Sequence, residues 1–183
     1  MNTMAHPRRH AQEQRVTLAL ALTQLRTHNF AVLSTVGDDG KPHSAGVNYG
    51  VSRPGVDLAI YVMTRRHLQK ARNVAQNPQV SVVVPLSRRL LWFLPPPTIQ
   101  LHGRAEILDW TDAEGSEIFR RFWVGRRILV AYQEAHRRGE RRICFLKIIP
   151  DPVISTYMVG VSVWALRRRM EAGAAKVIIP SRQ

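Results

Sequence analysis

The chain has 183 residues, a hydrophobic content of 45% and a formal net charge of +14 at pH 7. This length suits a single domain that folds around its own core, and no apolar run approaches the roughly 18 residues that a membrane-spanning helix needs. The positive charge favours an anionic partner, such as a nucleotide, a phosphorylated cofactor, a nucleic acid or an acidic lipid.

The cysteine content and the N-terminus bear on the compartment. Cys144 is the only cysteine, so an internal disulfide is excluded, and its apolar neighbours predict a small core residue. Arg8 and Arg9 are not followed by an apolar segment, and the sequence therefore does not predict a signal peptide. We expect a cytoplasmic protein in which a basic tail, residues 1–9, precedes one domain, residues 10–183.

The first third of the chain predicts a helix followed by three antiparallel strands. Turn signals separate the strands, because Asp39-Gly40 lies between the first two and Pro54-Gly55 between the next two. The predicted ranges are His10–His28 for the helix and Phe30–Val36, His43–Val51 and Val56–Met63 for the strands.

A basic helix is predicted after the third strand. Thr64 is placed as its N-cap, the helical pattern covers Arg65–Gln76, and Asn77-Pro78 ends it. The next predicted strand covers Val80–Val84.

The start of this helix is a candidate phosphate seat. The N-terminus of a helix carries unpaired N–H groups and a partial positive charge, which attract anions. The side chains that would add to this seat are Thr64, Arg65, Arg66 and Lys70. The local pattern leaves an alternative open: a capped surface helix whose solvated polar face includes Arg66, Lys70 and Asn73.

Proline-rich and strand-like segments follow. Pro85–Pro97 is interpreted as a loop or lid that carries Trp92 and Phe93, because its three consecutive prolines cannot join a central strand. The remaining predicted ranges are strands Thr98–Leu108, Arg142–Ile149 and Val153–Met158, a short basic helix Trp164–Met170, and an apolar tail, Lys176–Ile179, that could pair with a sheet edge.

A long helix is predicted between these strands. Thr111 and Glu114 form a capping-box pattern at its start. The helix runs to about Arg138, with a break expected at Gly125 and Gly139 expected as the C-terminal stop.

The pattern as a whole favours a mainly β fold with flanking helices. Six or seven short, mostly antiparallel strands are typical of a closed or split β-barrel. A doubly wound parallel sheet does not fit, because tight turns join the first three strands.

No motif for nucleophilic, metal or nucleotide chemistry is present. The sequence lacks the GxSxG, HExxH, P-loop and GxGxxG patterns, and its seven histidines show no metal-ligand spacing. His43 and His102 could face a pocket, although a structural role is the simpler interpretation. We therefore predict no metal site and assign no catalytic residue; in an enzyme of this kind a cofactor would carry the reaction.

Several segments occur in an order that carries a family resemblance. They extend from about Leu25 to Tyr157 and are FAVLSTVGDDGKPHSAGVNYGV, IYVMT, the spacing of Lys70, Asn73, Asn77 and Pro78, VSVVV and IQLHGRAEIL. Together they resemble the flavin-binding split barrels related to pyridoxamine 5′-phosphate oxidase. The resemblance implies an antiparallel split barrel that forms a homodimer, with FMN at the dimer interface.

The resemblance also implies which residues hold the phosphate arm of the flavin. Lys70 matches a lysine that contacts the cofactor phosphate, and Met63 and Thr64 match a strand end beside the ribityl-phosphate arm. Members of the family often carry an arginine one or two places before the lysine, where this chain has Leu68-Gln69. Arg65 is the candidate that would compensate.

The ring of the flavin would lie against two strands. The segment Ser44–Asn48 matches the strand that borders the isoalloxazine ring, so Ser44, Val47 and Asn48 are candidate contacts. Gln100 lies with Thr98 on the strand that, by resemblance, supplies a further polar contact to the ring.

These observations favour a flavin-dependent oxidoreductase that works as a homodimer on a small substrate of unidentified structure. FMN is the expected cofactor; a deazaflavin is the alternative, since surplus arginine suits its acidic tail, and haem is a further one. A different class of function is a non-enzymatic flavin- or haem-binding protein, or a basic nucleic-acid-binding protein. The last is less favoured because the arginine clusters are scattered and not interleaved with aromatic residues, and no membrane partner is expected.

Overall fold

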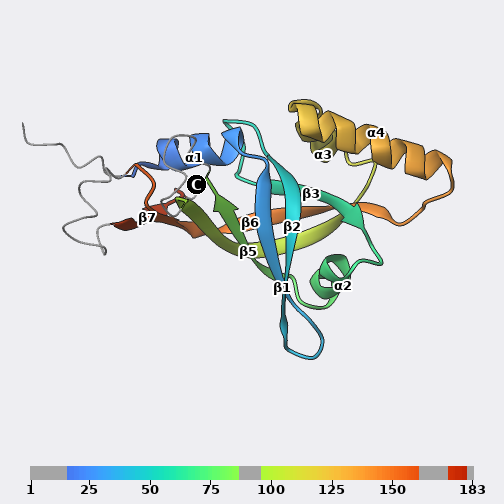
Figure 1. Ribbon diagram of the computed structural model, residues 1–183, viewed down its shortest axis with the longest axis horizontal. Coiled ribbons are helices and arrows are strands. Elements are labelled where there is room, and N and C mark those ends of the chain that lie inside the picture. Colours follow the sequence, from blue (N-terminus) through green and yellow to red (C-terminus); the bar gives the residue numbers. More distant parts are fainter. Residues whose placement is uncertain (1–15, 87–95, 161–172, 181–183) are drawn as a thin grey trace, which may run out of the picture.

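The computed structural model describes residues 16–86, 96–160 and 173–180 (Figure 1). The sequence predictions for residues 1–9, for Trp92 and Phe93, and for Trp164–Met170 fall outside these ranges. The described elements are, in chain order, α1 (Leu18–Thr27), β1 (Phe30–Val36), β2 (Pro42–Val51), β3 (Ile60–Arg65), α2 (Gln69–Gln76), β4 (Gln79–Pro85), β5 (Thr98–Asp109), α3 (Ala113–Arg120), α4 (Trp123–Arg137), β6 (Ile143–Tyr157) and β7 (Ala174–Ile178). None of the described helices is long and apolar enough to cross a membrane.

The strands form one antiparallel sheet that closes into a barrel. Their order is β3-β2-β1-β4-β5-β6-β7, and a further pairing of β3 with β6 joins the first six strands into a ring. β7 lies outside the ring and pairs with the second half of β6. The predicted barrel with flanking helices is therefore confirmed, and so is the pairing of the C-terminal apolar tail with a sheet edge.

Alternate residues of the strands fill the barrel. Leu33, Val82, Leu101 and Ile148 each expose 1% of their surface and belong to one apolar cluster. Figure 1 shows α1 and β7 toward one end of the barrel and α2 toward the other. Leu25 of α1 is fully buried in the same cluster, and its carbonyl accepts a hydrogen bond of 2.9 Å from the Tyr49 hydroxyl.

A second, smaller core attaches α3 and α4 to the outside of the barrel. We call these two helices the helical hairpin. Tyr61 and Met63 of β3 pack there against Ile118 and Phe119. Because successive side chains of a strand point to opposite faces, β3 is buried on both sides, once by the barrel and once by the hairpin.

The predicted bounds of the first elements need two corrections. α1 begins at Leu18 because the Thr17 side chain caps it, so the predicted helix His10–His28 does not continue through residues 16 and 17. β3 begins at Ile60, and not at Val56, because the Ser52 hydroxyl donates to the Asp57 carbonyl at 2.8 Å and holds the preceding loop.

The start of α2 also differs from the prediction. Strand pairing with β6 continues through Arg65, and the Arg66 N–H donates to the Arg142 carbonyl at 2.6 Å. The backbone of residues 64–66 is therefore already used in the sheet, and α2 begins at Gln69. Leu68 is the N-cap, so the prediction of Thr64 as the cap is wrong.

The predicted long helix is two helices. Asp112, and not Thr111, caps the first by accepting a hydrogen bond of 2.7 Å from the Gly115 N–H. The break falls between α3 and α4, at residues 121 and 122, and Gly125 lies within α4, where a Cβ would stand 2.3 Å from the Phe119 carbonyl oxygen. Gly139 follows the C-cap of α4 with a φ of 96°, as predicted for a helix stop.

β6 runs without interruption where two strands were predicted. Its pairing with β3 ends at Ile148, and its pairing with β7 starts at Val153. Pro150 and Pro152 lie between these points, outside the pairings of β6 with β3 and β7, where a missing N–H costs no ladder hydrogen bond. The Pro152 carbonyl still accepts a hydrogen bond of 2.6 Å from the Ile179 N–H. The bend predicted at Gly103 coincides with a shift in the register of β5 against β6.

Candidate functional site

A cavity of about 270 Å³ lies between the hairpin of β1 and β2 and the start of α2. It contains two residues that the sequence singled out for a cofactor, Ser44 and Lys70. The complete lining consists of Thr35, His43, Ser44, Ala45, Leu68, Gln69 and Lys70. The fold therefore brings the predicted phosphate lysine and one predicted ring contact together, although they are far apart in the sequence.

The start of α2 presents positive charge to this cavity. Leu68 caps the helix without a side-chain hydrogen bond, and the first turn contains no acidic residue. The first N–H groups of a helix carry partial positive charge, and Lys70, which is half-buried, adds a full charge beside them. An anion placed in the cavity would meet both.

Buried polar contacts hold the helix start against the barrel. The Asn73 side-chain amide donates to the Thr35 hydroxyl at 2.9 Å, and Gln69 donates to the Asn73 side-chain oxygen at 2.7 Å. Asn73 is 1% exposed and Thr35 is 2% exposed. The alternative that placed Asn73 on a solvated face is therefore wrong for this residue, and its amide links α2 to β1.

Ser44 and Asn48 point outward from β2. Ser44 lies opposite Ser34 of β1, and the two hydroxyl oxygens are 2.9 Å apart. Asn48 lies opposite Phe30, whose ring extends over Gly46, where a Cβ would stand 3.1 Å from the ring. The exposed Phe30 ring thus covers the outer face at Gly46, between Ser44 and Asn48.

Gln100 lies on the same outer face, on β5. Its amide nitrogen is 3.3 Å from Nε2 of His102. β1 and β4 separate β5 from β2, which corresponds to about 14 Å along the sheet at the usual strand spacing. The outer face between Asn48 and Gln100 is therefore wide enough for a planar ring system.

Four other predicted contacts do not line the cavity. Val47 and Thr64 belong to strand faces that point into the barrel, and they are 6% and 1% exposed. Met63 packs in the second core. Arg65 lies 3.5 Å from Glu140, and its guanidinium is 5.0 Å from the centre of the Tyr132 ring, so its charge is directed toward α4.

Sequence reasoning did not identify all of the lining residues. Thr35, Leu68 and Gln69 were not proposed, Ala45 was included only within the segment Ser44–Asn48, and His43 was named only as a residue that could face a pocket. Strand alternation was the available signal for Thr35, because it separates the inward and outward residues of β1. Gln69 could have been found from its place directly before Lys70.

The described residues show no group prepared for nucleophilic or metal chemistry. Burial raises the pKa of the Cys144 thiol to about 11, so it is protonated at neutral pH. Within the described ranges there is no cluster of three or more histidine, cysteine or acidic side chains that could hold a metal ion. The cavity can bind and orient a ligand, and no catalytic side chain is assigned to it.

Comparison with solved structures finds the same fold in proteins of distant sequence. HutZ, the heme storage protein from Vibrio cholerae, is 15% identical with a TM-score of 0.57, over 76% of this chain and 94% of that chain. A heme binding protein from Mycobacterium smegmatis is 16% identical with a TM-score of 0.61, over 87% of this chain and 56% of that chain. A FAD-binding protein from Mesorhizobium loti is 18% identical with a TM-score of 0.51, over 77% of this chain and 92% of that chain.

Sequence comparison places the chain in a family. The search of curated proteins found no match. A family model described as pyridoxamine 5′-phosphate oxidase matches residues 19–151, which include all of the closed barrel except the end of β6. The chain belongs to the pyridoxamine 5′-phosphate oxidase family.

Proposed function

We propose that this protein is a flavin-dependent oxidoreductase that binds FMN as a homodimer and acts on a small substrate. The observation that carries the proposal is the cavity at the start of α2, which Lys70 and Ser44 both line beside a helix N-terminus that has no side-chain cap. The phosphate of FMN would occupy this cavity, and the isoalloxazine ring would lie over the outer face of the barrel. The family assignment supports a cofactor of this kind.

Few cationic groups are available to bind the phosphate of FMN. Leu68 and Gln69 occupy the places before Lys70, and neither is a cation. The Gln69 side chain is already engaged, because it donates to Asn73 and accepts a hydrogen bond of 2.6 Å from Arg72. Lys70 and the first N–H groups of α2 would therefore supply most of the electrostatic attraction for a phosphate.

The size of the cavity supports a site that two protomers share. Ligand pockets usually measure about 300–1,000 Å³, and the cavity, at about 270 Å³, is smaller than that range. The rest of the cofactor would lie on the exposed face that carries Asn48 and Gln100. A second copy of the chain that covers this face would shield the ring from water.

The flavin, when bound, would supply the hydride or electron transfer. The protein would bind the phosphate through Lys70, orient the ring against β2 and β5, and exclude water through the second protomer. A deazaflavin fits the same phosphate cavity, and its acidic tail would suit the surplus of arginine. Haem is the alternative of a different chemical class.

The absorption spectrum of the protein tests this proposal. Protein is incubated separately with FMN, with a deazaflavin and with haemin, each excess is removed by gel filtration, and the spectrum of the eluted protein is recorded. We expect the two absorption bands of FMN in the fraction that has the mass of a dimer. Failure to retain either flavin contradicts the proposal, and a Soret band alone would favour a haem-binding protein.

A further inference from the structure

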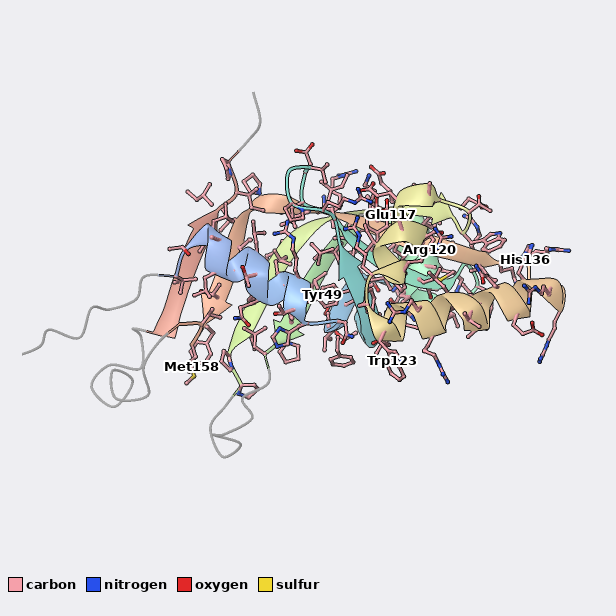
Figure 2. The ribbon with its side chains drawn as sticks, turned by 90° about the horizontal axis from the view of Figure 1, so that it is seen from above. Tyr49, Glu117, Arg120, Trp123, His136 and Met158 are labelled. Atoms are coloured by element: carbon pink, nitrogen blue, oxygen red, sulfur yellow. The ribbon has the colours of Figure 1, made fainter. Side chains whose placement is uncertain are left out.

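One face of α4 carries arginines around an exposed tryptophan. Spacings of three and four residues place six side chains on this face, which we call the α4 stripe: Trp123, Arg126, Arg127, Val130, Arg137 and Arg138. Gly125 and Leu129 on the opposite face are buried against the rest of the protein. Figure 2 shows Trp123 at the edge of the helical hairpin, directed away from the barrel.

The apolar members of the stripe are unusually exposed. Trp123 exposes 66% of its surface and Val130 exposes 63%. Tryptophan is the largest apolar side chain, so its exposure on a helix that has a buried face available is evidence for a contact with a partner.

The charge of the stripe is not neutralised by the acids of the hairpin. Within the described part of the chain, neither Arg126 nor Arg127 forms an ion pair, and only Glu134 pairs with members of the stripe, Arg137 and Arg138. The other acids of this region have partners elsewhere: Glu114 with Tyr61 and Lys147, Glu117 with Arg53 and Arg121, and Glu140 with Arg65 and Arg142. The stripe therefore has a positive excess that attracts an anionic partner.

The cationic side chains of the helical hairpin and the turn after it are all of one type. All eight cationic residues between 113 and 142 are arginine, with no lysine among them. A guanidinium group binds phosphate through two parallel hydrogen bonds and stacks on aromatic rings, whereas an ammonium group does neither. The Arg127 guanidinium lies 5.7 Å from the centre of the Trp123 ring, so a cation–π contact is present on the stripe.

Three kinds of partner surface could cover the stripe, and the arrangement of its residues favours one of them. A second copy of the same face is disfavoured because both stripes are positive. A membrane surface suits a helix whose cations and apolar residues lie on different faces, whereas here Arg126 and Arg127 lie between Trp123 and Val130. Single-stranded nucleic acid offers phosphates and planar bases at alternating positions, which matches Trp123 beside Arg126 and Arg127 on one helix face. The folded helix thus corrects the expectation that no arginine cluster is interleaved with an aromatic residue.

We propose that the α4 stripe binds single-stranded nucleic acid. Trp123 and Arg127 stack on bases, and the other arginines bind phosphates. The contact involves the outside of the hairpin and uses no residue of the flavin cavity, so this proposal stands or falls independently of the proposed oxidoreductase activity.

The test is fluorescence anisotropy of labelled oligo(dT) and oligo(U) with the full-length protein. If the three other arginines contact phosphates, the slope of log K against log salt concentration is about −2, since each contact on a single strand contributes about −0.7. Trp123→Leu, which keeps an apolar side chain without a stacking surface, lowers the affinity at least about fivefold. Trp123 is exposed in the native protein, and an unchanged denaturant midpoint verifies that the Trp123→Leu variant is folded.

Two double variants with the same change in charge distinguish the contribution of the stripe to binding from that of the net charge of the protein. Arg126→Glu with Arg127→Glu changes the charge by the same amount as Lys41→Glu with Lys176→Glu, whose lysines are exposed outside the helical hairpin. We expect the first pair to abolish binding at moderate salt and the second pair to retain it. Equal losses in the two pairs, no binding to either oligonucleotide at low salt, or binding to vesicles of anionic phospholipid in preference to the oligonucleotides would each overturn the proposal.

Discussion

The start of α2 and the α4 stripe are both basic, but they present their charge on surfaces of different shape. At α2, one lysine and the end of a helix border a cavity, and a buried polar contact between Asn73 and Thr35 lies behind them. On α4, two arginines flank an exposed tryptophan, and two more arginines lie at the other end of the same convex helix. A concave site with one cation suits the phosphate of a small molecule, whereas a convex row of cations suits a polymer of phosphates. Shape and the number of cations together distinguish the two regions.

The largest expected effect concerns the attachment of the hairpin. Phe119 is fully buried, and its ring centre lies 5.6 Å from that of Phe145. Phe119→Ala should lower the free energy of unfolding by about 3–5 kcal/mol, because it removes a large buried ring and leaves a cavity. Denaturant unfolding measures this loss. A loss below about 1 kcal/mol would mean that the second core does not hold the hairpin to the barrel.

The second prediction addresses the concave region. Lys70→Ala should weaken FMN binding by about 1.5–3 kcal/mol, or roughly 10- to 150-fold in Kd, because it removes a charge-assisted hydrogen bond to the phosphate. Isothermal titration of FMN measures the change. The control is Lys41→Ala, since Lys41 is exposed and paired with Asp39 at the tip of the β1–β2 hairpin.

The FMN titration also tests whether the two basic regions bind their ligands independently. The Arg126→Glu, Arg127→Glu double variant should bind FMN as the unmodified protein does, because its side chains lie on the outside of the hairpin. A similar loss of FMN affinity in this variant and in Lys70→Ala would show that overall charge governs binding, and the distinction between the two basic regions would fail.

The third prediction addresses the contact that positions α2. Thr35→Val and Asn73→Ala should each cost about 1–3 kcal/mol of stability, because each leaves a buried polar group without its partner. The double variant should lose less than the sum of the single losses, by about 1 kcal/mol. Unfolding in urea measures the coupling, and strictly additive losses would rule out a direct contribution of this hydrogen bond.

The smallest expected effect is the pH dependence of the turn between α4 and β6. Hydrogen bonds from the Arg142 side chain, and then from its backbone N–H, lower the pKa of Glu140 from 4.5 to about 2. Because the pKa is lower in the folded protein, the stabilisation is complete above about pH 4.5 and is lost as the pH falls toward 2. Urea midpoints between these values should fall less in Glu140→Gln than in the unmodified protein, and parallel curves would exclude this contribution.

The barrel could be predicted because its signals are local and agree with one another. The strand Phe30–Val36 was predicted with the bounds that β1 has, since β-branched residues and the Asp39-Gly40 turn indicate the same hairpin. The family resemblance gave the order of the segments and led to Lys70. Agreement between local signals is the condition under which sequence patterns specify a fold.

The errors occur where contacts distant in sequence determine the local structure. Thr64 has the sequence context of an N-cap, but pairing with Cys144 of β6 keeps it in a strand. Asn73 looks like a surface residue of a basic helix, yet its partner is Thr35, thirty-eight positions earlier. Trp123 and Arg127 were not recognised as a pair because their contact depends on the helix starting after residue 122.

The central claim is that the cavity beside Lys70 binds the phosphate of a flavin. FMN and riboflavin share the isoalloxazine ring and the ribityl chain, and only FMN carries the phosphate. Their dissociation constants for the unmodified protein, measured side by side in the same buffer, therefore isolate the contribution of this cavity. If Lys70 and the start of α2 hold the phosphate, FMN binds at least about tenfold more tightly than riboflavin. Equal affinity for the two compounds would show that the cavity does not bind the phosphate.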